Sequence, residues 1–319
     1  MIDQVSAFIR HVFSEVKPVK FPRYPLPSKN HNNFLPLIGV LLLTACSGQP
    51  TPSTSAADLP TPVPVTPTSP APVAIVNGEE IPSDIYEIHL SQYRAAQAQS
   101  GTLLASEGVE QIVLEDLVAQ LLLAQAAREA GFVLDEATID QRISAVVTQA
   151  GGQEALDAWL TAQGYTAEQF RRDLALEIEA GWMRAQVTDA VPLTAEQVEA
   201  RQILLTELFD AERLLGQLQG GTPFEQVALN NDPQGLGYLG WFPRGYLLQP
   251  AVEEAAFALQ PGEFSQIIET ELGFHLIEVL NRATDRPLTP QARLALQMQA
   301  LEDWVAEHRT QASVEILLP

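Results

Sequence analysis

The chain has 319 residues, of which 46% are hydrophobic and 18% charged, a composition typical of a globular protein with room for two domains. From residue 46 onward it carries 13 arginines, no lysine and 38 acidic residues. This acidity argues against binding to nucleic acid, whose phosphates need basic side chains, and against electrostatic docking on anionic lipid. Because Cys46 is the single cysteine, the composition also excludes an internal disulfide and a multi-cysteine metal site.

Residues 1–45 have the pattern of a signal peptide of the lipoprotein type. Residues 34–45 are nearly all apolar, follow a lysine-containing segment and end in small residues. They are too few to cross a bilayer, which takes about 20 residues. The ending Leu43-Thr44-Ala45-Cys46 resembles a bacterial lipobox, and this resemblance implies cleavage before Cys46 and lipid attachment to its sulfur. The alternatives are an ordinary secreted protein, or a short anchor in which the cysteine is incidental.

Residues 46–72 are predicted to be a tether. The segment 47–72 contains eight prolines among serine, threonine and alanine, and it has neither a helical nor a strand period. Proline-rich chain favours the extended polyproline II conformation, so the tether could reach roughly 80 Å at about 3.1 Å per residue. Folding is therefore expected to begin near residue 73.

Residues 73–192 are predicted to form a mainly helical domain that opens with a β-hairpin. Apolar residues on both sides of Asn77-Gly78 predict a tight turn between two short strands. Apolar residues then recur at helical spacing, and a capping box at Thr166/Gln169 opens the last helix. His89 is interpreted as a residue at the edge of the core and not as a metal ligand. One helix is expected to begin after Ser83. Further helices are expected at residues 108–130, 135–149, 153–163 and 166–187.

In residues 193–283 short strands alternate with helices. The expected order is β-α-α-β-α-β-β, which is typical of a small α+β domain whose sheet is covered by helices. In the stretch 239–280, turns at 243–245 and 260–263 bracket a short helix, and a strand that contains His275 follows. The other expected elements are a strand at 200–205 and helices at 209–219 and 223–229.

Residues 284–319 are predicted to return to the helical domain. A strand at 313–317 could pair with the hairpin at 73–81. Such pairing would close one lobe from both ends of the chain and leave the middle domain as an insertion. Before that strand, a helix at 289–308 presents the apolar residues Leu294, Leu296, Met298, Leu301, Trp304 and Val305.

Motifs for other chemistries have little support. Residues 235–240 spell GxGxxG, but a dinucleotide fingerprint follows a strand and opens a helix, whereas this stretch follows a predicted helix and runs into Trp241. The sequence has no GxSxG, HExxH or P-loop motif, and only His89, His275 and His308 follow residue 46. We therefore expect no metal site and no cofactor.

Five pieces in residues 200–282 carry a family resemblance: ARQILL, TPFEQVALNNDP, LGWFPRG, EEAAFALQPGEFS and TELGFHLIEVLNR, in that order. This part of the chain resembles the parvulin family of peptidyl-prolyl isomerases. The lipobox, the proline-rich tether, the NGEEI start, the helical flank and the returning C-terminal helix are similar to the PrsA and SurA class of extracytoplasmic foldases. Together the two resemblances cover nearly everything from Val73 to the end.

The parvulin resemblance implies a site made of polar residues behind an apolar proline pocket. Gln202 stands where the family has a histidine on its first strand, and Val252 where it often has phenylalanine. The glutamine keeps the capacity for hydrogen bonding but does not titrate. Asp232 could equally form a turn before Pro233, and His275 could be a buried strand residue that only satisfies its neighbours. The implied catalytic residues are Gln202, Asp232, Thr270 and His275, and the implied pocket residues are Leu239, Leu247 or Leu248, and Val252.

The resemblance implies a peptidyl-prolyl cis-trans isomerase and chaperone that is lipid-anchored outside the cytoplasm. Its expected partners are unfolded or nascent secreted polypeptides with Xaa-Pro bonds, and the membrane through Cys46. Apart from Arg201 and Arg244 the proposed site lacks basic residues, so a phosphate-dependent isomerase is not expected. The alternatives are a holdase that binds chains without isomerising them, and a structural lipoprotein that recruits one fixed partner.

Overall fold

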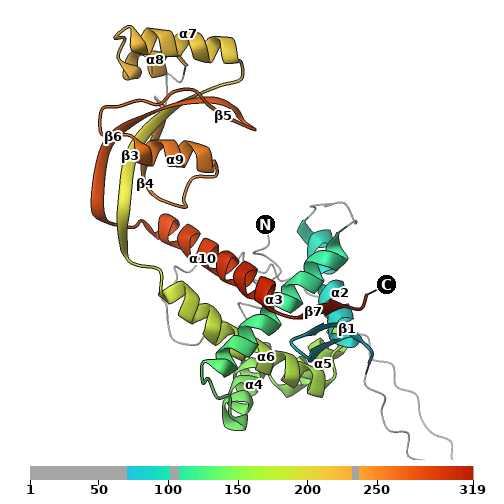
Figure 1. Cartoon of the computed structure of the whole chain (residues 1–319). Helices are drawn as coiled ribbons and strands as arrows, with labels where there is room; N and C mark the ends of the chain where they lie inside the picture. Colours follow the sequence, from blue (N-terminus) through green and yellow to red (C-terminus); the bar gives the residue numbers. More distant parts are fainter. Residues whose placement is uncertain (1–69, 101–107, 232–236, 319) are drawn as a thin grey trace, which may run out of the picture. The chain divides into compact units, whose positions relative to one another are not determined.

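The computed structural model describes residues 70–100, 108–231 and 237–318 (Figure 1). The predicted signal peptide, Cys46, nearly all of the tether and Asp232 lie outside these residues. Within them, none of the helices combines the length and the hydropathy that crossing a membrane requires. The described chain contains a mainly helical lobe and a sheet domain, which we take in turn.

The helical lobe contains a small sheet built from both ends of the described chain. Strands β1 (Pro72–Val76) and β2 (Glu79–Pro82) form the predicted hairpin, with Asn77 and Gly78 at φ 52° and 87° in a turn that needs two positive φ values. Strand β7 (Val314–Ile316) pairs antiparallel with β1, giving the order β2-β1-β7. The pairing anticipated between the C-terminal strand and the hairpin is therefore present.

The lobe's helices agree closely with the ranges expected from periodicity. Both halves of the capping box at Thr166 and Gln169 are formed, and Asp135 caps its helix by accepting from the Thr138 N–H. Residues of α3 fill the centre of the core, among them Leu117, which is 3% exposed. The helices are α2 (Ser83–Ser100), α3 (Val109–Glu129), α4 (Glu136–Ala150), α5 (Gln153–Gln163) and α6 (Ala167–Asp189).

Helix α10 (Pro290–Gln311) packs on α3 and α6 with only part of its apolar residues. Leu301 and Trp304 pack against a small cluster formed by Leu123, Ala124 and Ala180. Leu294 and Met298, by contrast, are 56% and 46% exposed. Of the apolar residues that the sequence places on this helix, Leu301 and Trp304 thus pack on α3 and α6, whereas Leu294 and Met298 stay largely exposed.

The sheet domain has the predicted order of elements. It runs β3 (Thr194–Leu205), α7 (Leu208–Gln219), α8 (Phe224–Asn231), β4 (Tyr238–Pro243), α9 (Pro250–Ala258), β5 (Ile268–Thr270) and β6 (Gly273–Pro287). The strands form an antiparallel sheet in the order β4-β3-β6-β5. Fold class and element order are thus confirmed.

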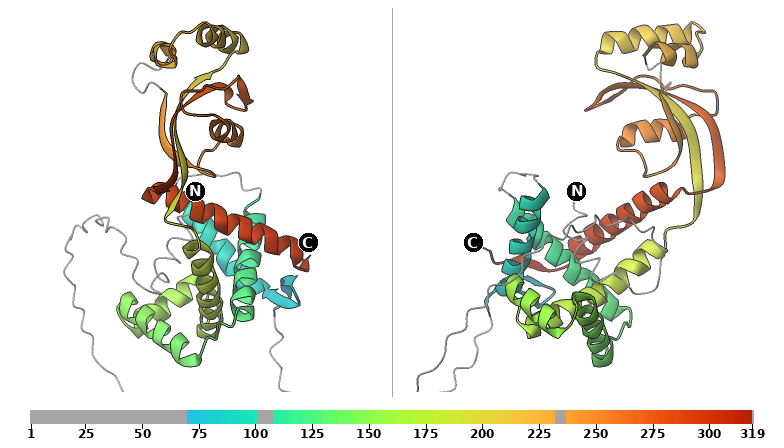
Figure 2. Two further views of the ribbon diagram at one scale, coloured as in Figure 1. Left: turned by 60° about the vertical axis from the view of Figure 1, so that its left-hand side comes forward. Right: turned by 180° about the vertical axis from the view of Figure 1, so that it is seen from behind.

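Strands β3 and β6 are longer than the alternating side-chain pattern predicts. They pair with each other from Leu205↔Phe274 to Thr194↔Pro287, so backbone hydrogen bonds continue well past the apolar residues. The register shifts twice along this ladder, between Ala195 and Gln197 and between Glu199 and Ala200. Such bulges bend strands, which accounts for the strong curvature of both strands in Figure 2.

Helices cover both faces of this sheet. The views in Figures 1 and 2 agree that α7 and α8 lie on one side and α9 on the other. Alternate residues of β3 and β6 supply the two cores: Ile203 and Leu276 pack under α7 and α8, whereas Ala200 and Ile277 pack under α9. Because Gln202 shares its face with Ala200, it points to the side on which α9 lies.

Candidate functional site

Three polar side chains on the α9 side of the sheet form one chain of hydrogen bonds. The Nδ1 atom of His275 lies 3.1 Å from the Oε1 atom of Gln202. Its Nε2 atom lies 2.8 Å from the hydroxyl of Thr270. The structure therefore brings together three of the four residues implied as catalytic, while Asp232 lies outside the described residues.

Strand register explains why residues so far apart in sequence meet. Leu204 pairs with His275 and Gln202 pairs with Ile277, so Gln202 and His275 are diagonal neighbours on one face. Thr270 reaches the histidine across the β5–β6 turn, where its hydroxyl also accepts from the Leu272 N–H at 3.1 Å. This turn depends on Gly273, whose φ is 127° and where an added Cβ would lie 2.3 Å from a backbone oxygen of β3.

Burial keeps the imidazole of His275 neutral. The residue is 2% exposed, and desolvation lowers its pKa below the ordinary value for histidine. With the Gln202 oxygen as acceptor, Nδ1 carries the proton and Nε2 accepts from the hydroxyl of Thr270. The site therefore contains an ordered, uncharged hydrogen-bond chain.

An apolar cluster lies on the same face of the sheet. Val252 on α9 is 1% exposed, and Leu239 and Leu247 pack against the cluster that contains it. Leu248, the alternative to Leu247, is 94% exposed. The reason is local, since the turn after β4 directs Leu247 inward and its neighbour outward.

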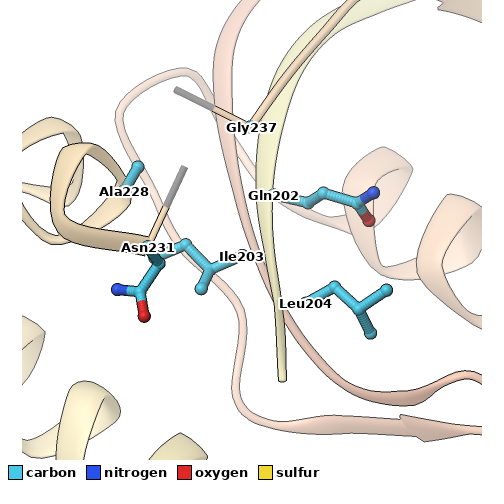
Figure 3. A pocket seen from close by; sticks show the side chains of 6 residues that line it. All are labelled: Gln202, Ile203, Leu204, Ala228, Asn231 and Gly237. Carbon is cyan, nitrogen blue, oxygen red and sulfur yellow. The ribbon is translucent and has the colours of Figure 1, made fainter. Parts of the chain in front are cut away.

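A small hollow lies at the end of β3, and Gln202 is one of the residues that line it. Figure 3 shows Gln202 and Leu204 pointing to one side of the strand and Ile203 to the other, toward Ala228 and Asn231. Gly237 also lines this hollow, and its carbonyl accepts from the Gln202 N–H at 2.8 Å. An added Cβ at Gly237 would lie 1.7 Å from the Gln202 carbonyl oxygen. This glycine of the GxGxxG stretch thus allows a close strand contact and precedes a strand, not a helix.

Both Arg201 and Arg244 have partners within the sheet domain. Arg201 lies on the α7–α8 face, 2.7 Å from Glu278 and 3.7 Å from Glu225. Arg244 lies over the ring of Phe257, 4.1 Å from its centroid. Among the described residues there is also no group of three or more histidine, cysteine or acidic side chains suited to a metal ion.

Comparison with protein families identifies both parts of the chain. The family described as "PPIC-type PPIASE domain" matches residues 204–281, which contain the whole hydrogen-bond chain except Gln202. The family described as "SurA-like N-terminal domain" matches residues 63–184. The chain is a parvulin-type protein with a SurA-like N-terminal domain. Its parvulin domain is of the peptidyl-prolyl cis-trans isomerase type.

The chain is also similar to individual proteins and solved structures. The foldase protein PrsA of Caldanaerobacter subterraneus is 27% identical over 229 residues, which cover 65% of this chain and 72% of that protein. The chaperone SurA of Alcanivorax borkumensis is 24% identical and covers 66% of this chain, but the match spans only 56% of that chaperone. A crystal structure of PrsA from Bacillus cereus is 14% identical, covers 76% of this chain and 90% of that chain, and gives a TM-score of 0.43.

The structure adds residues that the sequence pattern did not single out for the parvulin domain. Glu253 accepts three backbone hydrogen bonds from the turn that carries Leu247. Buried Ser265 accepts from the backbone N–H of Ile277 at 3.0 Å, on the strand that carries His275. An acidic residue in the first turn of a helix that follows a glycine turn was the available signal for Glu253. Ser265 had no comparable signal.

The helical lobe contains a separate buried polar cluster around His89. Its Nε2 atom lies 3.1 Å from the carboxylate of Asp173, which also accepts from the hydroxyl of Tyr165 at 2.6 Å. The side chains of His89 and Asp173 are 17% and 15% exposed. His89 is therefore part of a largely buried ion pair between α2 and α6. The interpretation of this residue as a core-edge histidine missed its partner, because Asp173 is 84 residues away in sequence.

Proposed function

We propose that this chain is a peptidyl-prolyl cis-trans isomerase and foldase that acts on unfolded secreted polypeptides. The observation that carries the proposal is the uncharged chain Gln202–His275–Thr270 beside the apolar cluster of Leu239, Leu247 and Val252, both on one face of the parvulin sheet. An apolar surface grips a proline ring, and polar groups of fixed orientation act on the neighbouring amide.

The reaction needs no covalent step. A planar amide is held by resonance, and the barrier to rotation is about 18–20 kcal/mol. At the transition state the amide is twisted and has lost that resonance, so a site that fits the twisted form better than either planar form accelerates exchange. An apolar surface favours this state because it solvates the charge-separated planar amide poorly. Unfolded chains hold roughly 10–30% cis at Xaa-Pro bonds and exchange slowly, which gives such an enzyme its substrates.

The test is cis/trans exchange of an Ala-Leu-Pro-Phe peptide, followed by exchange NMR with the full chain added in catalytic amounts. We expect a rate increase that scales with protein concentration. A parallel assay measures suppression of the aggregation of a denatured, proline-containing client protein. If exchange is not accelerated while aggregation is suppressed, the chain is a holdase and the isomerase proposal is wrong.

Gln202→His is expected to leave isomerase activity equal to or higher than that of the wild type. The imidazole would occupy the position at which the parvulin family has its first-strand histidine and would keep a hydrogen-bonding partner for His275. The readout is kcat/KM in the same exchange assay, with Gln202→Ala as the matched variant that removes the partner. An activity below that of the alanine variant would contradict this account of the site.

The lipid anchor and the extracytoplasmic location are part of the same proposal. They are supported by the lipobox-like sequence ending at Cys46 and by the proline-rich segment behind it. In a bacterial host, metabolic palmitate labelling is expected to mark the wild type and the control Ser47→Ala, and to be absent from Cys46→Ala. Label retained in the Cys46→Ala protein would rule out acylation at this sulfur.

A further inference from the structure

The carboxylate of Glu253 organises the turn between β4 and α9. Its Oε1 atom accepts from the Gly245 N–H at 2.6 Å, and its Oε2 atom accepts from the N–H groups of Tyr246 and Leu247 at 2.9 and 3.0 Å. Three consecutive N–H groups converge on one anion because Gly245 has a φ of 79°. Hydrogen bonds to an ionised acceptor are the stronger kind, so this turn is held firmly.

The turn that Glu253 holds carries Leu247, which the proposed function assigns to the proline-binding surface. Leu247 packs against the cluster that includes Val252, and Val252 directly precedes Glu253 on α9. One turn of helix therefore supplies both a residue of the apolar cluster and the acceptor that fixes the turn carrying Leu247. A shift of the turn would move Leu247 while leaving Val252 in place.

Helix α9 is itself fixed to the sheet at its other end. The guanidinium of Arg282 on β6 donates to the backbone oxygens of Phe257 and Leu259 at 2.8 and 2.6 Å. It also forms an ion pair with Glu196 on β3 at 2.9 Å. The position of Glu253 is thus determined by the same two strands that carry Gln202 and His275.

We propose that Glu253 is a positioning residue for the isomerase site. Its carboxylate sets the spacing between Leu247 and the floor of the pocket, and so determines how tightly a proline ring is held. It acts through the backbone of the turn and does not touch the substrate. This inference rests on the proposed isomerase function.

The test uses the full chain with Glu253→Ala, Glu253→Gln and the exposed neighbour Glu254→Ala as matched control. Exchange NMR on the Ala-Leu-Pro-Phe peptide gives kcat and KM, and a titration gives the Kd of the same peptide. We expect Glu253→Ala to raise KM and Kd about tenfold while kcat changes less than about threefold, because the wall holds ground state and transition state alike. The KM and Kd of Glu253→Gln, which keeps one acceptor oxygen, are expected to lie between those of the wild type and Glu253→Ala. Those of Glu254→Ala are expected to match the wild type.

Two readouts are independent of catalysis. The amide proton resonances of Gly245, Tyr246 and Leu247 are expected to shift upfield in Glu253→Ala, and the NOEs from the Leu247 methyl groups to the apolar cluster to weaken. If the wild type binds the peptide without accelerating exchange, the proposed function fails while Kd and NOEs still decide the role of Glu253. Unchanged NOEs, or a parallel fall of kcat and Tm at constant KM, would overturn the positioning role.

Discussion

Replacing His275 with alanine is expected to lower kcat/KM for the Ala-Leu-Pro-Phe peptide at least about tenfold and to destabilise the parvulin domain by about 2–4 kcal/mol. The imidazole is 2% exposed and joins Gln202 to Thr270. Its removal leaves a cavity and two polar groups without their partner, and the polar chain beside the pocket is broken. Activity is measured well below the Tm of the variant, so that loss of folded protein does not account for the change.

The matched control is His308→Ala, which removes an imidazole that stacks on Trp304 in α10, outside the parvulin domain. It is expected to leave kcat/KM unchanged. If His275→Ala keeps full activity in its folded fraction, His275 has only a structural role as a buried strand residue. Loss of stability without loss of activity would lead to the same conclusion.

The stability of the parvulin domain is expected to depend on pH through the titration of His275. Burial lowers its pKa in the folded state, so the folded domain binds fewer protons than the unfolded one. Its contribution to stability is therefore present above the ordinary histidine pKa of about 6.5 and is lost as pH falls through the lowered value. Amide hydrogen exchange in β3 and β6 of the full chain should show this loss in the wild type but not in His275→Ala.

Replacing Asp173 with alanine is expected to destabilise the helical lobe by about 3 kcal/mol, because removing one partner leaves the other side of a largely buried pair uncompensated. His89 would lose its counter-charge, and the hydroxyl of Tyr165 would lose the acceptor at 2.6 Å. Hydrogen exchange in α3, which forms the centre of the lobe's core, measures this change within the full chain. The exposed Asp189→Ala on the same helix is the control and should change the exchange little.

The pH dependence of the helical lobe's stability gives a second test of the His89–Asp173 pair. Burial alone would lower the pKa of His89, but the charge and hydrogen bond of Asp173, with smaller effects of Glu177 and Asp116, raise it above the ordinary value. The stabilisation from His89 is therefore complete below pH about 6.5 and is lost as pH rises through the raised folded value. We expect the wild-type lobe to gain stability on mild acidification and Asp173→Ala to lack that gain. An equal gain in both proteins would contradict the ion pair.

Asp173 itself limits the effect at low pH. Burial would raise its pKa, but the attraction of His89 and the hydrogen bonds from His89 and Tyr165 lower it below the ordinary value. Its contribution is present above the ordinary pKa of about 3.9 and is lost as pH falls through the lowered value. The pair therefore stabilises the lobe most strongly between these two transitions.

Most of the fold followed from local signals in the sequence. The hairpin at Asn77-Gly78, the capping box at Thr166 and the order of elements in the sheet domain each depend on residues close together in the chain, and all are present. The ends of β3 and β6 could not be predicted from local signals, because the length of a paired strand is determined by its partner strand and not by the alternation of its own side chains. Spacing placed apolar residues along α10 but did not show which of them pack: Leu301 and Trp304 contact the lobe, whereas Leu294 and Met298 are exposed.

Only part of the candidate site could be predicted from the sequence. Family resemblance pointed to Gln202, Thr270 and His275, and their hydrogen bonds require no more than the register of three strands. It did not separate Leu247 from Leu248, because one extra residue in the turn changes which side chain faces inward. Contacts across long sequence separations, such as His89 with Asp173, left no local pattern from which they could be predicted.

The pairing of β7 with β1 has a consequence for the order of folding. Asn77 and Ser313 exchange hydrogen bonds across a separation of 236 residues, so the lobe's small sheet lacks its third strand until residues 314–316 have been made. The sheet domain, by contrast, is one uninterrupted segment whose partners are all present before residue 290. Loop closure over so long a span is slow compared with contacts inside one segment. We therefore expect a newly made chain to complete its parvulin domain before its helical lobe.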